Sequence, residues 1–134
     1  MPRAERKHFA LKLLLDEHIW PGVAALLKQT IPGANVEGIH QLFGGRLMNS
    51  DDTVILREAH RTGHTLVTFD VNTIPAVLHE MGTGEEAHSG VIFVSAKSFA
   101  QNDHAGLARA LAEILHLEGE SDWTNRVMFL RRGG

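Results

Sequence analysis

The sequence predicts an α/β protein with a mainly parallel sheet, and two observations support this prediction. Apolar runs of strand length alternate with segments of helical periodicity, which is the pattern of βαβ units. Two of these runs end directly in an aspartate, Asp16 after Leu-Leu-Leu and Asp70 after Leu-Val-Thr-Phe. In an open α/β sheet, ligands bind outside the carboxyl ends of the strands, so both aspartates are candidates for a functional site.

Five segments have the composition of strands. Residues 11–15 form a continuous apolar run that is typical of a buried strand, and residues 65–69 are β-branched and apolar. Residues 35–39 form a weaker second strand after a Pro-Gly turn. Residues 91–94 and 126–130 complete the expected sheet.

Helical segments separate the first three of these strands. Residues 20–28 are expected to form a helix with Pro21 near its start, where the missing N–H costs nothing. Ser50 can cap a second helix that runs to about Arg61 and that Gly63 terminates.

The later connections are also predicted from composition. A short helical turn is expected around Pro75, followed by a solvated loop over 81–89, which is rich in Gly and Glu. Asp103 can cap an Ala- and Leu-rich helix that ends near His116.

This last helix carries two kinds of apolar residue. Four large residues form a core stripe: Leu107, Leu111, Ile114 and Leu115. The small residues Ala108 and Ala112 would allow close approach of a second helix. The core is the expected role of the stripe, and a homodimer contact beside it is an alternative that the sequence leaves open.

A third aspartate, Asp52, lies in the first turn of the second expected helix. At about 100° per residue, Ile55, Leu56 and Ala59 share a narrow arc, and Asp52 falls near its centre. Asp52 should therefore point toward the sheet. Asp51 lies about 100° away on the helix and should be solvated. The structural alternative is that both are first-turn acids favoured by the helix dipole.

The composition is that of an ordinary globular domain. We expect one domain over residues 1–134, with short flexible tails at 1–9 and 131–134. The absence of cysteine excludes a thiol nucleophile and a disulfide framework. No apolar stretch approaches the roughly 20 residues that span a bilayer, and the charged start lacks the apolar core of a signal peptide, so we expect no membrane contact and a cytoplasmic location.

The net charge is −3 with neutral histidines. Proteins that bind nucleic acid by charge alone usually carry a basic patch or a high pI, so this charge counts against strong autonomous binding of nucleic acid. It counts less against a metal-dependent nuclease, because bound divalent ions add positive charge where the phosphate docks.

Three carboxylates that converge at one edge of a sheet would repel one another unless a divalent cation joined them. We therefore expect a metal-dependent phosphoryl-transfer site, first of all a nuclease. Such clustering also predicts that Asp70→Asn raises the melting temperature of the metal-free protein at neutral pH. Each acid has a structural alternative as well: Asp16 can cap the next helix, and Asp70 can form an Asx turn.

Three segments follow one another along the chain, namely Leu-Leu-Leu-Asp-Glu, Ser-Asp-Asp-Thr-Val-Ile-Leu-Arg-Glu-Ala and Gly-His-Thr-Leu-Val-Thr-Phe-Asp. Together they resemble the small bacterial PIN-like proteins, which are relatives of the VapC-type toxins of toxin–antitoxin operons. The resemblance implies a three-layer α/β/α sandwich with an acidic pocket that binds Mg²⁺ or Mn²⁺. It also implies a hydrolase that cleaves RNA and is often restrained by an antitoxin protein.

The resemblance carries the metal-binding and catalytic acids over to Asp16, Asp52 and Asp70. A further acid commonly follows the strand-terminal aspartate by two residues, and this position is Asn72 in the present chain. Because asparagine is neutral, the site is open to three interpretations: one metal instead of two, weak binding, or no activity.

Four other residues have supporting roles in this hypothesis. Glu17 or Asp51 would orient the attacking water, and the side-chain carbonyl of Asn72 would add an oxygen to a hard-cation site. Arg46 follows two glycines and would offer its guanidinium to a phosphate. The alternative for Arg46, which we favour, is a plain turn with a solvated side chain.

Two other functions stay open. A PIN-like protein without activity would serve as a binding or dimerisation module, which Asn72 and the acidic net charge both favour. A receiver-like phospho-acceptor domain also needs acids at strand ends and a downstream lysine, and Lys97 lies just beyond the fourth expected strand. Phosphorylation by a small phosphodonor would distinguish this function from a nuclease.

Overall fold

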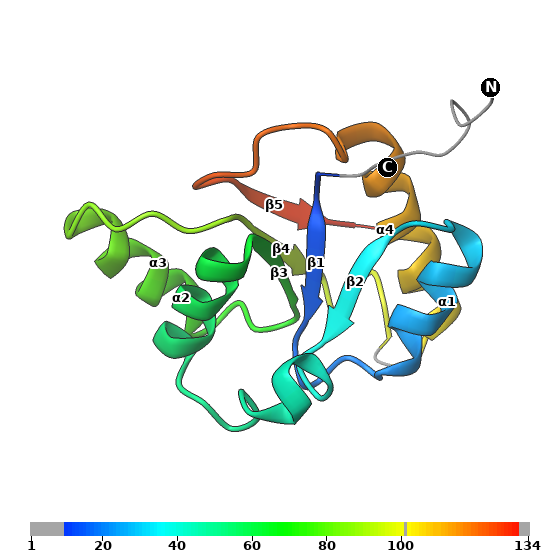
Figure 1. Cartoon of the computed structure of the whole chain (residues 1–134), viewed down its shortest axis with the longest axis horizontal. Coiled ribbons are helices and arrows are strands. Elements are labelled where there is room, and N and C mark those ends of the chain that lie inside the picture. The colour runs from blue at the N-terminus through cyan, green and yellow to red at the C-terminus, as the bar shows by residue number, and fades with distance from the viewer. Residues whose placement is uncertain (1–9, 101, 132–134) are drawn as a thin grey trace.

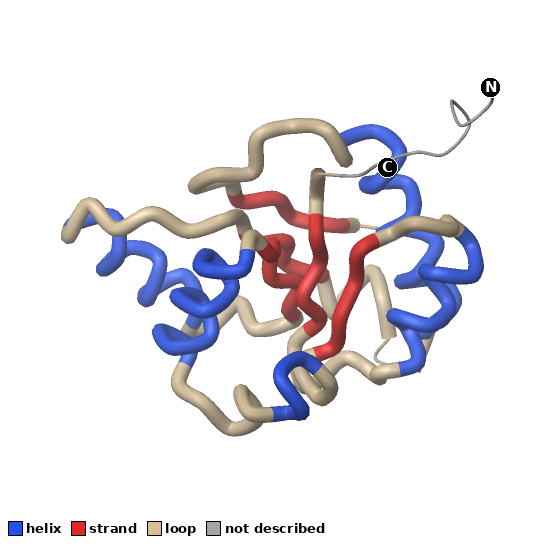
Figure 2. The backbone as a smooth tube through the Cα atoms, viewed as in Figure 1, coloured by secondary structure: helices blue, strands red, loops and turns tan. Residues whose placement is uncertain are grey.

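The computed structural model describes residues 10–100 and 102–131, so the expected tails, apart from Arg131, lie outside the described residues. Its centre is a five-stranded, all-parallel sheet in the order β2-β1-β3-β4-β5. Helices cover both faces of the sheet (Figures 1 and 2), and the predicted three-layer α/β/α sandwich is confirmed.

The strands agree with the sequence prediction to within one residue at each end. They are β1 (Lys12–Leu15), β2 (Asn35–Gly38), β3 (His64–Thr68), β4 (Val91–Val94) and β5 (Val127–Leu130). The helices are α1 (Gly22–Thr30), the 3₁₀ turn η2 (Leu42–Gly45), α2 (Asp52–Thr62), α3 (Ile74–Thr83) and α4 (His104–Glu118). Within the described ranges, none of these helices combines the length and the apolarity needed to cross a membrane.

Two predictions about helix ends are wrong. Asp51, and not Ser50, is the residue before the first turn of α2, and its side chain makes no capping hydrogen bond. α3 is a ten-residue helix instead of a short turn, and it extends into the segment expected to be a loop. The reason is tertiary packing: Met81, inside that segment, is buried against the sheet and holds the last turn of α3 in place.

Two other predictions about helix ends are confirmed. Gly63 ends α2 in the left-handed conformation, with φ of 75°. Asp103 caps α4, because its carboxylate accepts a hydrogen bond from the backbone N–H of Gly106 at 3.1 Å. Each of these helix caps satisfies backbone N–H or C=O groups that the end of a helix otherwise leaves without a hydrogen-bond partner.

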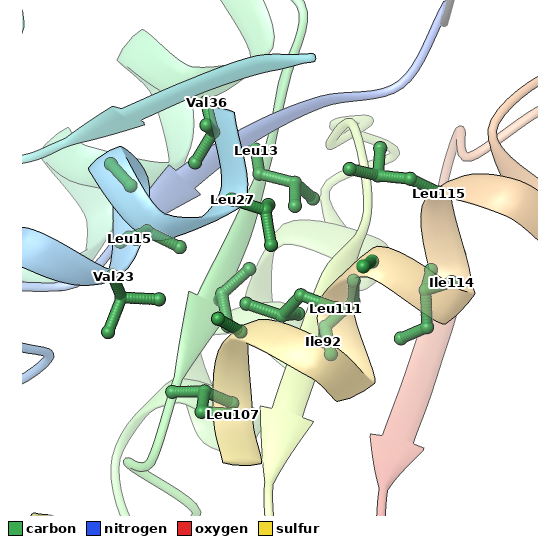
Figure 3. Packing of buried hydrophobic residues seen from close by; sticks show 14 of the residues in the cluster. Leu13, Leu15, Val23, Leu27, Val36, Ile92, Leu107, Leu111, Ile114 and Leu115 are labelled. Carbon is green, nitrogen blue, oxygen red and sulfur yellow. The ribbon is translucent and has the colours of Figure 1, made fainter. Parts of the chain in front are cut away.

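Each face of the sheet has its own apolar core. Alternation along β1 sends Leu13 and Leu15 toward α1 and α4, and Leu14 toward α2 and α3. The predicted stripe of α4 is buried in the first core together with residues of α1 (Figure 3). Ala108 and Ala112 are buried in the same core, so the helix that they admit is α1 of the same chain. Both side chains are buried, and the possible homodimer stays a prediction.

The last connection, β4–α4–β5, has the opposite hand to the other three. From β1 to β2 the chain crosses the sheet in one direction, with α1 on one face. From β2 to β3 and from β3 to β4 it crosses in the opposite direction, with α2 and α3 on the other face, so these three connections have the same handedness. The connection from β4 to β5 runs in the same direction along the sheet as the connection through α3, but α4 lies on the face that carries α1. Because roughly 98% of such crossovers are right-handed, α4 is the left-handed exception.

This placement of α4 leaves one face of the edge strand β5 uncovered. Met128 and Leu130 pack toward α4, whereas Val127 and Phe129 point to the other face and are 43% and 59% exposed. Phe129 stacks on Phe93 of β4, with ring centroids 5.3 Å apart.

Candidate functional site

The candidate site lies at the carboxyl edge of the sheet, between β1 and β3. Asp16 directly follows β1, and Asp70 lies two residues beyond β3. These two strands are neighbours, and the N–H of Asp16 donates to the carbonyl of Val67 at 3.0 Å. From β1 the chain passes to β2 on one side of β1, and from β2 it passes to β3 on the other side of β1. The site is therefore the point where the strand order reverses, which is where open α/β sheets bind ligands.

Thr68, the last residue of β3, connects two of the predicted acids. Its hydroxyl donates to Oδ2 of Asp16 at 2.6 Å and accepts from the backbone N–H of Asp70 at 3.0 Å. The side chain is fully buried, so loss of the hydroxyl would leave both partners without compensation from water. Sequence reasoning missed Thr68, although a polar residue within an otherwise apolar run was an available signal.

Asp16 does not have the capping role that we considered as its structural alternative. α1 begins after Pro21 without a side-chain cap. The carboxylate of Asp16 instead accepts from Thr68 through Oδ2 and from the N–H of Glu17 through Oδ1, at 2.7 Å.

Asp70 is held by the turn that leads into α3. Its Oδ1 accepts from the backbone N–H groups of Asn72 (2.9 Å) and Thr73 (3.0 Å), and its Oδ2 accepts from the hydroxyl of Thr73 (2.5 Å). The Asx turn that was the structural alternative for Asp70 is therefore present, and it fixes Asp70 at the edge of the sheet. Asn72 serves this turn through its backbone, and its side chain is exposed.

The surroundings of Asp70 favour its ionised form. Partial burial raises the pKa of its carboxyl, but hydrogen bonds from Thr73 and Asn72 and the charge of nearby His18 lower it by more. The pKa of Asp70 therefore lies below its ordinary value. This direction opposes the sequence expectation that removal of the charge on Asp70 would stabilise the metal-free protein.

α2 contributes the third acid. Asp52 is half-buried at the start of the helix face that packs on the sheet, and Asp51 is exposed, both as predicted. The other members of that face are buried, namely Ile55, Leu56 and Ala59. Oδ2 of Asp52 lies 2.7 Å from the hydroxyl of Thr73, so α2 is joined directly to the loop after β3.

Thr73 places one hydroxyl between two carboxylates. Its Oγ1 lies 2.7 Å from Asp52 and 2.5 Å from Asp70. A threonine hydroxyl has a single proton to donate, so it satisfies one of these carboxylate oxygens at a time. The site thus has one more acceptor than it has donors at this point, and a proton or a cation would balance it.

The remaining predicted residues lie on two sides of the acids. Glu17 follows Asp16, and its Oε1 accepts from the backbone N–H of Asn49 at 3.2 Å. Arg46 is turned toward the outside of α2, where it pairs with Glu58 at 3.6 Å. The structure therefore turns the Glu17 side chain toward the loop that precedes α2 and directs Arg46 away from the acids.

A pocket of about 380 Å³ opens at this edge of the sheet. It is lined by Asp16, His18, Phe69, Asp70, Asn72 and Thr73. Asp52 reaches this pocket through Thr73 and is not part of its wall. Among the described residues, no group of three or more His, Asp or Glu side chains is arranged to hold a metal ion. The acids are connected in pairs, through Thr68 and Thr73, and are not gathered around one point.

Comparison of the chain with protein-family models, with curated proteins and with solved structures found no match.

Proposed function

We propose that this protein is a PIN-like, metal-dependent ribonuclease that hydrolyses RNA phosphodiester bonds at the carboxyl edge of its sheet. One observation carries the proposal: Asp16, Thr68, Asp70, Thr73 and Asp52 form a continuous chain of hydrogen-bonded side chains and backbone at the strand-order reversal. The toxin role and the antitoxin partner that go with this family are part of the same proposal.

The residues present suit a hard cation such as Mg²⁺ or Mn²⁺. Their donors are carboxylate and hydroxyl oxygens, and Mg²⁺ usually takes one or two carboxylates and keeps several waters. Asp52 and Asp70 face one shared hydroxyl and would hold the ion, with Asp16 at the opposite end of the network. When bound, the ion would polarise the scissile phosphate and lower the pKa of a water molecule.

The side chains of the site have separate tasks in this proposal. Thr68 keeps Asp16 and Asp70 in fixed relation across two strands. Glu17, whose backbone N–H donates to Asp16 and whose carboxylate accepts from the N–H of Asn49, would orient the attacking water. Arg46 has no task at the phosphate, because it pairs with Glu58.

A binding module without catalytic activity is the second candidate. The pairwise arrangement of the acids in the described part of the chain favours it, because a site for two metals needs more carboxylates around each ion. The neutral Asn72, at a position where the resembling family commonly has an acid, favours it as well.

A receiver-like domain is favoured by the strand order alone. The order 2-1-3-4-5 is one of the two common orders of doubly wound sheets, and Lys97 is exposed in the turn after β4. The left-handed placement of α4 departs from the right-handed crossovers that such sheets use throughout. Incubation with acetyl phosphate followed by intact-mass measurement tests this candidate directly.

Calorimetric titration with Mn²⁺ and with Mg²⁺ tests the main proposal without knowledge of the RNA target. We expect stoichiometric binding to the wild type and its loss in Asp70→Asn. Asp51→Asn is the matched control, because it removes a neighbouring exposed acid outside the network and should leave binding unchanged. Absence of binding to the wild type would reject the proposal for the isolated chain.

A further inference from the structure

Trp20 is an exposed aromatic side chain beside the proposed ribonuclease site. It is 50% exposed, although it follows a buried strand by only five residues. The N–H of Ile19 donates to the carbonyl of Asp16 at 3.0 Å and closes a turn. Such a turn keeps its ends less than about 7 Å apart, so the backbone of Trp20 lies within about 11 Å of that of Asp16.

Two neighbours hold the ring of Trp20 in place. A Cβ atom at Gly22 would lie 2.1 Å from Cη2 of Trp20, so the ring occupies space that only glycine leaves open. His104, the first residue of α4, packs against Trp20 with ring centroids 4.6 Å apart and ring planes tilted by 32° to each other. The packing of α1 against α4 therefore brings two aromatic rings together at the edge of the sheet that carries the acids.

We propose that Trp20 and His104 form a stacking subsite for an unpaired base of single-stranded RNA. This inference rests on the proposed ribonuclease function and names its substrate class. Stacking of a base on an aromatic ring strengthens binding by roughly 5- to 150-fold and accepts any base, since every base has a π-face. In a duplex the faces of the bases are covered by their neighbours, so the subsite selects single strands.

A stacking subsite would supply binding free energy that the charge of this protein does not provide. With a net charge of −3 and three carboxylates at the site, the chain gains little from general attraction to phosphates. Stacking does not depend on charge. Lys97, exposed in the turn after β4, supplies a local cationic group at the same edge.

The first test measures the affinity for an eight-nucleotide single-stranded RNA by fluorescence anisotropy of a labelled strand, in EDTA. We expect Trp20→Leu to weaken binding about tenfold and Trp20→Phe to retain most of it. Phe129→Leu is the control, because Phe129 is also exposed (59%, against 50% for Trp20) but lies on β5. Equal affinity of Trp20→Leu and wild type, an equal loss in Phe129→Leu, or equally tight binding of duplex RNA would overturn the inference.

A second variant keeps both tryptophans. Trp123 is buried and donates its indole N–H to the carbonyl of Glu118 at 2.9 Å, so quenching by unlabelled RNA reports on Trp20. Gly22→Ala displaces the Trp20 ring without removing it, and we expect it to weaken both quenching and affinity. Unchanged quenching in Gly22→Ala would contradict the subsite.

The outcome is independent of the metal proposal because EDTA is present throughout. RNA binding that depends on Trp20, combined with no Mn²⁺ binding, would keep the subsite and reject hydrolysis. Mn²⁺ binding without any Trp20-dependent RNA binding would reject the subsite and leave the ribonuclease proposal standing.

Discussion

The hydroxyl of Thr73 lies 2.7 Å from the carboxylate of Asp52, and this contact joins α2 to the loop that follows β3. The same hydroxyl lies 2.5 Å from Asp70. Two carboxylates therefore compete for one proton donor, and the hydroxyl can donate to only one of them at a time.

Asp52→Asn should stabilise the metal-free protein relative to Asp51→Asn. The amide of an asparagine at position 52 can donate to the oxygen of Thr73, which leaves the Thr73 proton free for Asp70. Both variants lose a negative charge near the start of α2, so their comparison cancels the effect of the helix dipole. We expect a difference in melting temperature of about 4 °C in EDTA, from roughly 1 kcal/mol. Identical melting temperatures would show that the competition costs nothing.

Asp70→Asn should lower the free energy of unfolding at pH 7. The pKa of Asp70 is lowered in the folded protein, so its contribution is fully present above the ordinary carboxyl pKa of about 4. That contribution is lost as the pH falls through the lower pKa that Asp70 has in the folded protein. Urea denaturation of the wild type and the variant at pH 7, 5 and 3 should show a gap in the free energy of unfolding that narrows at the lowest pH. A variant more stable than wild type at pH 7 would show that repulsion among the acids dominates.

The melting temperature should fall as the pH is lowered from 7 to 5. His88 is buried, and its Nδ1 accepts from the N–H of Gly90 at 3.0 Å, which requires this nitrogen to be unprotonated. Burial lowers the pKa of His88, and the charge of His60 lowers it further. The contribution of neutral His88 to stability is therefore fully present above the ordinary histidine pKa of about 6.5. It is lost as the pH falls through the lower pKa that His88 has in the folded protein.

His88→Asn provides the test of this pH dependence. The asparagine oxygen can accept the same bond from Gly90 without titrating, so the variant should show a flatter profile of melting temperature against pH. Some dependence should persist, because burial also lowers the pKa of His64. The exposed His79, replaced by asparagine, is the control. A profile in His88→Asn as steep as that of the wild type would exclude His88 as the source.

Two glycine substitutions should change stability in opposite directions. Neither Gly63 nor Gly82 has an atom within 4 Å of the position that a Cβ would take. Gly63 has φ of 75°, so Gly63→Ala should cost about 1 to 2 kcal/mol of left-handed backbone strain. Gly82 lies in α3, so Gly82→Ala should add about 0.4 to 1 kcal/mol. Thermal unfolding measures both, and a stabilised Gly63→Ala would contradict the assigned conformation of this helix end.

The candidate site shows where sequence reasoning succeeded and where it stopped. Asp16 and Asp70 were identified because an acid at the end of an apolar run is a local signal, and the orientation of Asp52 followed from helical periodicity. Thr68 and Thr73 were missed. Their importance depends on which strand ends and which helix lie beside them in the folded protein. The local sequence around each threonine does not indicate these neighbours.

The length of α3 and the environment of α4 were also beyond local patterns. Gly82 and Gly84 mark the end of α3 as a loop by composition, but burial of Met81 against the sheet extends the helix. Ala108 was expected to allow close approach of a second helix. The left-handed crossover places α4 on the same face as α1, so the helix that packs there is α1.

The sequence by itself determined the class of the fold, the positions of all five strands and the face of α2 that carries Asp52, because periodicity and end signals are local properties of the chain. The tertiary structure alone decided the strand order, the face on which α4 packs and the hydrogen bonds that join Asp16, Asp70 and Asp52. These relations depend on how the apolar faces of all the elements fit together at once, which is a property of the whole chain and not of any segment.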